Sequence, residues 1–171
     1  KCLPIGPKAR HRNRAFDSGG GRENQLARLV RAGYLAGVPA NPPRLVDAME
    51  AAAPLDARAR AYLDINCGHC HSATGPAITS GLWLDAQTQD RLKLGFCKQP
   101  IAAGKGTGNR LHDIEPGNAA ASIFEFRMDS ADPAIMMPEV GRSVVHREGV
   151  QLIRDWINAQ PGSCGSAAGE S

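Results

Sequence analysis

Apolar residues recur at helical spacing in LDARARAYLDIN, the segment that spans residues 55–66. Its apolar positions fall on one side of a helix, and they are Leu55, Ala59, Tyr62 and Leu63. Pro54 suits the position just ahead of a helix, and Asp56 is favourable in a first turn. The pattern therefore predicts a helix over 55–66 that buries one face.

A second periodic segment, VVHREGVQLIRDWINA, spans residues 144–159. Ser143 is suited to cap the start of this helix, and Pro161 followed by Gly162 is suited to end it. Its predicted buried stripe consists of Val145, Gly149, Leu152, Ile153 and Trp156. Because glycine lowers helix stability, Gly149 indicates the close approach of another helix.

The rest of the second half of the chain has weaker patterning. AASIFEFRM (residues 120–128) predicts a third helix, whereas the glycine-rich stretch 72–118 is typical of a loop with one helical turn near 85–93. No segment alternates strongly between apolar and polar residues, so no strand is predicted. The fold class predicted from these elements is all-α.

The first 53 residues differ from the rest of the chain. Residues 1–22 are irregular and basic, and their charge run predicts a solvent-exposed flank. Apolar spacing predicts two short helices, at 23–35 and 44–52, with several prolines between them. We therefore divide the chain into an N-terminal extension (1–53), a main domain (54–164) and a disordered tail (165–171).

Composition limits the possible functions. The chain has 171 residues, of which 42% are hydrophobic and 22% charged, with no apolar run long enough to span a bilayer. A net charge of +3 and 5% aromatic residues do not favour nucleic-acid binding. We expect no nucleic-acid partner and no transmembrane segment.

The most informative motif is Cys-Gly-His-Cys-His at residues 67–71, directly after the predicted helix 55–66. Cys-x-x-Cys-His is the attachment sequence of c-type haem, in which both thiols bond to one porphyrin and the histidine binds its iron. A zinc site needs a second pair of ligands at suitable spacing, and Cys97 and Cys164 stand alone. A thioredoxin-like motif needs a surrounding βαβ pattern, which is absent.

Cysteine usage bears on the compartment. The chain begins Lys-Cys-Leu-Pro, without an initiator Met or a signal peptide, so we interpret it as a mature or trimmed chain. Attachment of haem to this motif takes place outside the bacterial cytoplasm, which predicts a periplasmic or otherwise extracytoplasmic protein. In an oxidising compartment we expect a Cys97–Cys164 disulfide, with Cys2 as the odd thiol; pairing of Cys2 with either of the others is the alternative.

These features resemble class I monohaem cytochromes c, over residues 54–160. A helix that ends in Cys-x-x-Cys-His, a Met-Pro element and a C-terminal helix with an inward aromatic residue carry the resemblance. ARAYLDINCGHCH, GPAITSGLWLD and MMPEVGRSVVHREGVQLIRDWI are similar to a little-characterised group of bacterial exported cytochrome c modules. In that group, PIGPKARHRNR and ENQLARLVRAGYLAG look like part of the same unit. The resemblance implies a helical fold around one covalently attached haem c.

The resemblance also implies that His71 and a methionine bind the haem iron as axial ligands. The methionine ligand of the family directly precedes a proline, which favours Met137, next to Pro138, with Met136 as the alternative. Met49 and Met128 fit apolar helix faces and are interpreted as core residues.

Supporting roles are assigned more broadly. In the family, a backbone carbonyl just after the motif accepts a hydrogen bond from the ligand histidine, which points to the segment with Pro76. Arg127 and Arg142 are candidate partners of the haem propionates. Trp83 is a candidate to cover the haem or to donate to a propionate, with a role in the core as the alternative.

The predicted function is that of a one-electron carrier, which is not itself an enzyme and which exchanges electrons with a redox partner protein. One alternative is the electron-accepting haem module of a larger dehydrogenase complex. Another is a haem peroxidase, which needs an open iron position and acid/base groups beside it.

Overall fold

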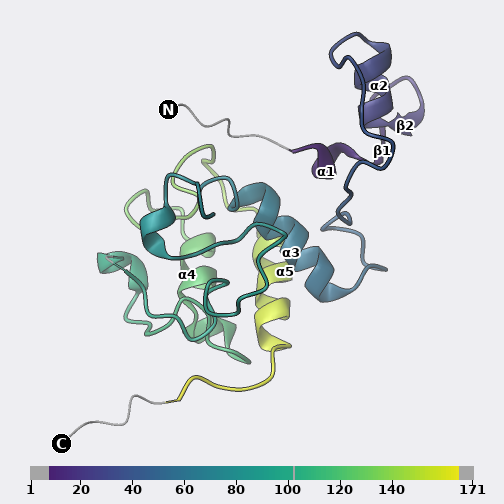
Figure 1. The fold of residues 1–171 in the computed structure, drawn as a ribbon. Helices are drawn as coiled ribbons and strands as arrows, with labels where there is room; N and C mark the ends of the chain where they lie inside the picture. Colours follow the sequence, from purple (N-terminus) through teal and green to yellow (C-terminus); the bar gives the residue numbers. More distant parts are fainter. Residues whose placement is uncertain (1–7, 102, 166–171) are drawn as a thin grey trace, which may run out of the picture.

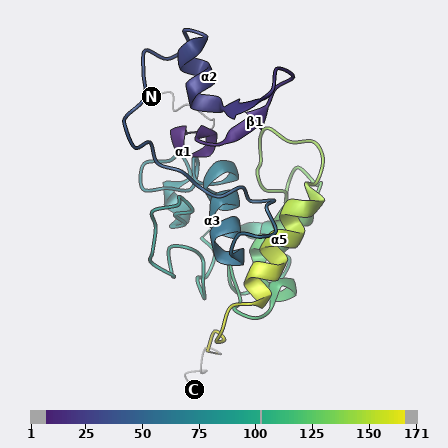
Figure 2. The same ribbon diagram turned by 90° about the vertical axis from the view of Figure 1, so that its right-hand side faces the viewer.

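The computed structural model describes residues 8–101 and 103–165. Its main body is built on α3 (Leu55–Asn66) and α5 (Arg147–Asn158), which lie side by side, with α4 (Ile123–Asp129) packed against α5 (Figures 1 and 2). Among the most deeply buried large side chains, Trp156, Ile153 and Ile157 come from α5, Leu63 from α3 and Ile114 from the stretch between α3 and α4. Burial of the two apolar stripes therefore holds the main helices together.

The helix α3 has the bounds that the sequence predicts, whereas α5 begins three residues later than expected. Ser143 does not cap it; the position before its first residue is occupied by His146. The carbonyl of His146 accepts the first helical hydrogen bond, from the N–H of Val150 at 3.0 Å. Its ring also lies 3.1 Å from the hydroxyl of Tyr62, which fixes the start of α5 against α3.

Gly149 of α5 lies directly against the side chain of Tyr62 of α3. A Cβ at this position would lie 2.1 Å from the hydroxyl oxygen of Tyr62, a distance that no side chain tolerates. The close approach predicted from this glycine is therefore confirmed.

The chain between α3 and α4 is mostly irregular, with three short 3₁₀ helices: η1 (Ile78–Ser80), η2 (Gly104–Thr107) and η3 (Ala119–Ala121). A disulfide joins Cys97 in this stretch to Cys164 beyond α5, with their Cα atoms 5.2 Å apart. The predicted pairing is confirmed, and Cys2 lies outside the described residues.

The N-terminal part contains α1 (Ala9–Arg12), an antiparallel pair of strands, β1 (Ala15–Asp17) and β2 (Arg22–Asn24), and α2 (Gln25–Arg31). The two strands and α2 project from the main body (Figure 1). The turn between the strands includes Gly19 and Gly21, both with positive φ. Asn24 ends β2 and caps α2 by accepting hydrogen bonds from two backbone N–H groups of its first turn.

The all-α prediction is wrong. The described residues contain a small two-stranded sheet, only 33% of them are helical, and most of the remainder is irregular. The helix expected at 44–52 is absent, and turns occupy residues 48–49 and 51–52. The division of the chain at residue 54 stays a prediction, and residues 166–171 of the predicted tail are not described.

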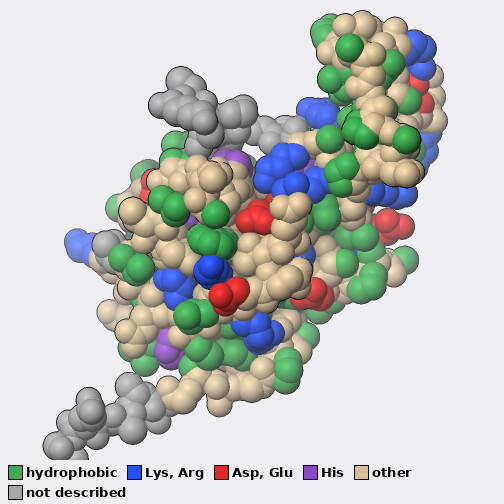
Figure 3. Space-filling model, viewed as in Figure 1, with side chains coloured by type: hydrophobic (Ala, Val, Ile, Leu, Met, Phe, Trp, Pro, Cys, Tyr) green, Lys and Arg blue, Asp and Glu red, His purple; other side chains and the backbone are tan. Residues whose placement is uncertain are grey.

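The basic segment is not a solvated flank, because part of it binds a buried carboxylate of α3. Asp64, 1% exposed, accepts two hydrogen bonds from the guanidinium of Arg10, at 2.6 and 2.7 Å. Nε2 of His11 lies 2.5 Å from the same carboxylate, and the backbone N–H of Ala86 donates to it at 3.1 Å. Lys and Arg side chains gather where the N-terminal part meets the main body (Figure 3).

We call these contacts of Arg10, His11, Asp64 and Ala86 the Asp64 latch. Although burial opposes ionisation, the hydrogen bonds from Arg10 and His11 hold the pKa of Asp64 well below its usual value. Nδ1 of His11 accepts from the backbone N–H of Lys8 at 2.9 Å, so its Nε2 carries the proton that is donated to Asp64. The latch therefore joins an ionised carboxylate to a neutral imidazole and a guanidinium.

Candidate functional site

The Cys-Gly-His-Cys-His motif forms the turn that directly follows α3. The N–H of Cys67 still bonds to the carbonyl of Leu63 at 2.8 Å, and the N–H groups of Cys70 and His71 bond back to the carbonyl of Cys67 at 3.0 and 2.9 Å. A Cβ at Gly68 would lie 3.0 Å from the carbonyl oxygen of Asp64, so a larger residue fits poorly there. The helix end thus places both thiols and the imidazole in one compact turn.

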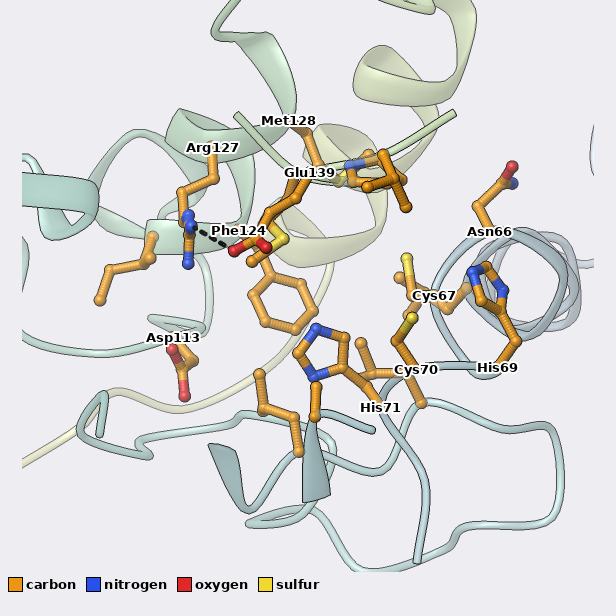
Figure 4. A pocket seen from close by; sticks show the side chains of 18 of the residues that line it. Asn66, Cys67, His69, Cys70, His71, Asp113, Phe124, Arg127, Met128 and Glu139 are labelled. Atoms are coloured by element: carbon orange, nitrogen blue, oxygen red, sulfur yellow. Dashed lines mark ion pairs between the residues drawn. The ribbon is translucent and has the colours of Figure 1, made fainter. Parts of the chain in front are cut away.

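The side chains of Cys67, Cys70 and His71 line a cavity of about 290 Å³ (Figure 4). This volume is at the lower end of the ~300–1,000 Å³ that is typical of ligand sites. The apolar wall is contributed by Leu63, Leu82, Leu84, Ile123, Phe124 and Val140. An adjoining cavity of about 220 Å³ shares several of its lining residues, Asn66, Cys67, Met128, Met137, Pro138 and Val140.

His71 projects into the cavity beside Cys70 and Phe124 (Figure 4). Burial lowers the pKa of its imidazole to about 4, and the positive charges of Arg127 and Lys98 act in the same direction. The ring is therefore neutral at pH 7, which is the form that binds a metal.

The second nitrogen of this ring, Nδ1, lies 3.0 Å from the hydroxyl of Ser80. The expected partner was a backbone carbonyl in the segment of Gly75 and Pro76. Pro76 lines the cavity, but in the described part of the chain Ser80 is the group that His71 Nδ1 meets. Ser80 was missed from the sequence, where nothing separates it from other loop serines.

Cys67 and Cys70 are free thiols. Burial, together with the proximity of Cys70, raises the pKa of Cys67 to about 12, so this thiol is not poised as a thiolate. Within the described residues, the one group of metal-ligating side chains whose donor atoms lie within 4.8 Å of one another is His112, Glu115 and Cys164. Its sulfur is already bonded to Cys97, which argues against a metal there.

Two methionines line the cavity, Met128 and Met137, whereas Met136 does not. The backbone N–H of Met137 donates to the carbonyl of Arg127 at 3.0 Å, which ties the Met-Pro segment to α4. Met128 is 9% exposed and belongs to the hydrophobic core as well. Met137, the methionine ligand expected from the sequence, therefore lines the cavity. Met128 lines it as well and is a second candidate for that ligand.

Arg127, which the sequence suggests as a partner of haem propionates, lies at the cavity wall. Its Nε donates to the carbonyl of Ile135 at 2.8 Å, and its guanidinium lies 3.9 Å from the carboxylate of Glu139 (Figure 4). Burial lowers the pKa of this guanidinium, without removing its charge at pH 7.

Arg142 lines the adjoining cavity and donates to the carbonyls of Met128 at 3.1 Å, Arg127 at 3.3 Å and Ser130. Its Nε is buried and has no hydrogen-bond partner among the described residues.

Trp83 does not line either cavity. The ammonium of Lys93 lies 3.4 Å from the centre of its ring, a cation–π contact. The structure therefore gives Trp83 a packing role away from the cavity.

Sequence reasoning also missed Asp113, a buried residue of the cavity wall. Burial raises the pKa of its carboxyl group, and the ammonium of Lys98, 3.2 Å away, opposes that rise. The two residues lie far from the motif in sequence, so only the folded chain reveals this pair.

Comparison with models of known protein families, with curated proteins and with solved structures finds no match. No helix in the described part of the chain combines the length and the apolar character needed to cross a membrane.

Proposed function

We propose that this chain carries one covalently attached haem c and acts as a one-electron carrier outside the bacterial cytoplasm. The observation that supports this most is the position of the Cys-Gly-His-Cys-His turn at the wall of an apolar cavity. Cys67, Cys70 and a neutral His71 all face that cavity, and the thioether of Met137 lines it too.

The donor set fits such a cofactor. Two free thiols provide the attachment points, and the neutral imidazole provides an iron ligand. Apolar walls suit a porphyrin face, while Arg127 at the cavity wall and Arg142 at the wall of the adjoining cavity are cations that suit its carboxylates.

When bound, the haem supplies an Fe(III)/Fe(II) couple that takes up and releases one electron. His71 and Met137 are the residues that would hold its iron, and a thioether ligand would raise the reduction potential. The apolar side chains around them exclude water and limit the change in solvation between the two charge states. In this proposal the chain exchanges its electron with a redox partner protein.

A peroxidase-type function is less well supported. It needs an open iron position beside an acid/base group, whereas thioether side chains line the cavity along with His71. We therefore keep the carrier function as the proposal.

The test is expression in a bacterial host that exports the chain and attaches haem to Cys-x-x-Cys-His motifs. We expect the intact mass to increase by one haem that survives denaturation, and a c-type absorption spectrum. C67S and C70S should each lose one thioether bond, and C67S/C70S should retain no covalent haem. C97S/C164S is the matched control and should keep the haem. A wild-type chain that folds and carries no covalent haem under these conditions would refute the proposal.

A further inference from the structure

Ser80 is the last residue of η1, and its hydroxyl contacts the imidazole of His71. Its Oγ lies 3.0 Å from Nδ1 of His71 and donates to the carbonyl of Ala77 at 2.7 Å. The backbone N–H of Leu82 donates to the same Oγ at 3.2 Å. The hydroxyl therefore has three polar neighbours on three sides.

Counting protons in this group fixes the tautomer of His71. A serine hydroxyl has one proton, and the short contact to the carbonyl of Ala77 uses it, because a carbonyl can only accept. The contact with His71 then requires the imidazole to donate, so Nδ1 carries the proton. Nε2 is left with its lone pair, which is the nitrogen that a metal ion can bind.

The backbone does not need this hydroxyl in order to form the turn. The carbonyl of Ala77 already accepts the backbone N–H of Ser80 at 3.0 Å, and the N–H of Gly81 closes the 3₁₀ turn onto Ile78, also at 3.0 Å. What the hydroxyl adds is an acceptor, which receives the N–H of Leu82 and faces Nδ1 of His71. Its own donation to Ala77 polarises the oxygen and makes it a better acceptor.

We propose that Ser80 is the positioning residue of the axial histidine: its hydroxyl holds His71 as the Nδ1–H tautomer and strengthens the imidazole as a ligand. This inference rests on the proposed haem site, and it deepens that proposal by naming the group that tunes the ligand. Hydrogen bonding at Nδ1 increases the electron density that the ring gives to the iron, which favours Fe(III) and lowers the reduction potential. Loss of the hydroxyl should therefore raise the potential.

The experiment compares three holoprotein variants with the wild type. S80A removes the acceptor, and S80T keeps a hydroxyl at the same position. S122A is the matched control, because Ser122 also donates to a carbonyl, that of Asn118 at 2.9 Å, and accepts a backbone N–H, that of Glu115 at 2.8 Å. Ser122 is fully buried and contacts no proposed ligand, so S122A reports the structural cost of losing such a hydroxyl.

Two quantities are measured: the reduction potential, and the proton resonance of His71 Nδ1–H in the diamagnetic reduced protein. In S80A we expect a higher potential, and an Nδ1–H resonance that moves upfield and exchanges faster with water. S80T should restore both quantities towards wild type, and S122A should change neither while losing thermal stability.

The inference fails if S80A leaves the potential and the Nδ1–H resonance unchanged, or if S122A shifts them equally. This outcome is distinct from failure of the proposed function, in which the wild type itself has no covalent haem or shows no histidine–iron ligation. If the wild type has covalent haem and histidine–iron ligation but S80A has the same potential and Nδ1–H resonance as the wild type, the proposed role of Ser80 is wrong and the carrier proposal is unaffected.

Discussion

Replacing Asp64 by Asn removes the charge at the centre of the Asp64 latch with little change in shape. The side chain of Asp64 is 0% exposed, and that of Arg10, which forms two hydrogen bonds with it, is 18% exposed. In D64N the guanidinium stays in place without a counter-charge. The new amide NH₂ also faces donors, so at least one hydrogen bond is lost.

Breaking a buried ion pair by removing one partner costs about 3–5 kcal/mol. The ammonium of Lys8 lies 3.4 Å from the same carboxylate on a side chain that is 37% exposed, so water reaches this site and we expect the lower end of that range, about 3 kcal/mol. For a domain of this size, that corresponds to a fall in melting temperature of roughly 6–12 °C. D64N should thus be one of the more destabilising single substitutions in the chain.

The assay is thermal and urea unfolding of the holoprotein, with D47N as the matched control. Asp47 also pairs with an arginine of the basic segment, Arg14, but both side chains are substantially exposed, at 45% and 36%. Exposed ion pairs contribute roughly 0–1 kcal/mol. If D64N and D47N lower the free energy of unfolding by the same small amount, the latch does not stabilise the fold and our reasoning is wrong.

The latch also predicts how stability depends on pH. The pKa of Asp64 is depressed in the folded state, so its contribution is complete above the unfolded value of about 3.9 and is lost as pH falls through the folded value. Burial lowers the pKa of the His11 imidazole, and the contacts of that ring with Asp64 only partly oppose the change. Below about pH 6.5 this histidine therefore binds a proton in the unfolded chain but not in the folded chain. This is a second reason for the stability of the folded protein to decrease as the pH falls.

Stability should accordingly decrease from about pH 6.5 downward, in two stages. H11Q should flatten the stage nearer neutrality, and D64N the more acidic one, in urea unfolding measured across that range. Acid limbs that are identical in wild type and both variants would contradict this assignment.

Three further predictions concern other parts of the molecule. M137A should abolish the near-infrared band of iron–thioether ligation, lower the reduction potential and admit carbon monoxide, whereas M136A should not; the same result from M128A instead would move the ligand to α4. C97A/C164A should lower the free energy of unfolding by about 4 kcal/mol, because the disulfide closes a loop with a sequence separation of 67, and calorimetry that shows no loss would contradict this. G149A should destabilise the protein by about 1–3 kcal/mol in urea unfolding, despite the better helix propensity of alanine, because its Cβ would clash with Tyr62; a more stable variant would show that α3 and α5 can separate at no cost.

Local patterns predicted the helices that bury an apolar stripe. The helix α3 was predicted to the residue because Pro54 and the Cys-Gly-His-Cys-His turn delimit a clear apolar face. Gly149 and the Cys97–Cys164 pair were also interpreted correctly, since each depends on one strong constraint: a missing Cβ, and two thiols left over from the motif.

The failures have physical causes that apolar spacing does not show. Residues 44–52 have apolar spacing but no helix, because the N–H of Met49, which a helix would pair with the carbonyl of Leu45, bonds to the side chain of Asp47 at 3.1 Å. The strands β1 and β2 have only three residues each, too few to show an alternating pattern. Gly19 and Gly21 were the available signal for the turn between them.

Asp64 shows most clearly what the sequence pattern conceals. It lies beside the apolar stripe of α3, in a position where an isolated sequence suggests a solvated carboxylate. The basic run eight to fourteen residues from the start of the chain was its partner, across more than fifty positions. The two charge signals were visible separately, and only their pairing required the structure.

The Asp64 latch also connects the N-terminal part of the chain to the candidate site, through the loop 84–86. Asp64 receives the N–H of Ala86 at 3.1 Å, and two residues earlier the N–H of Leu84 donates to the carbonyl of His71 at 2.8 Å. The loop 84–86 is thus fixed at one end by the latch and at the other by the motif itself. Because Gly68 also packs against Asp85 at this point, a Cβ there being 3.1 Å from its Cα, a shift of the loop would press on the motif. Residues 8–11 therefore support the Cys-Gly-His-Cys-His turn from outside, although they have no contact with the cavity that it lines.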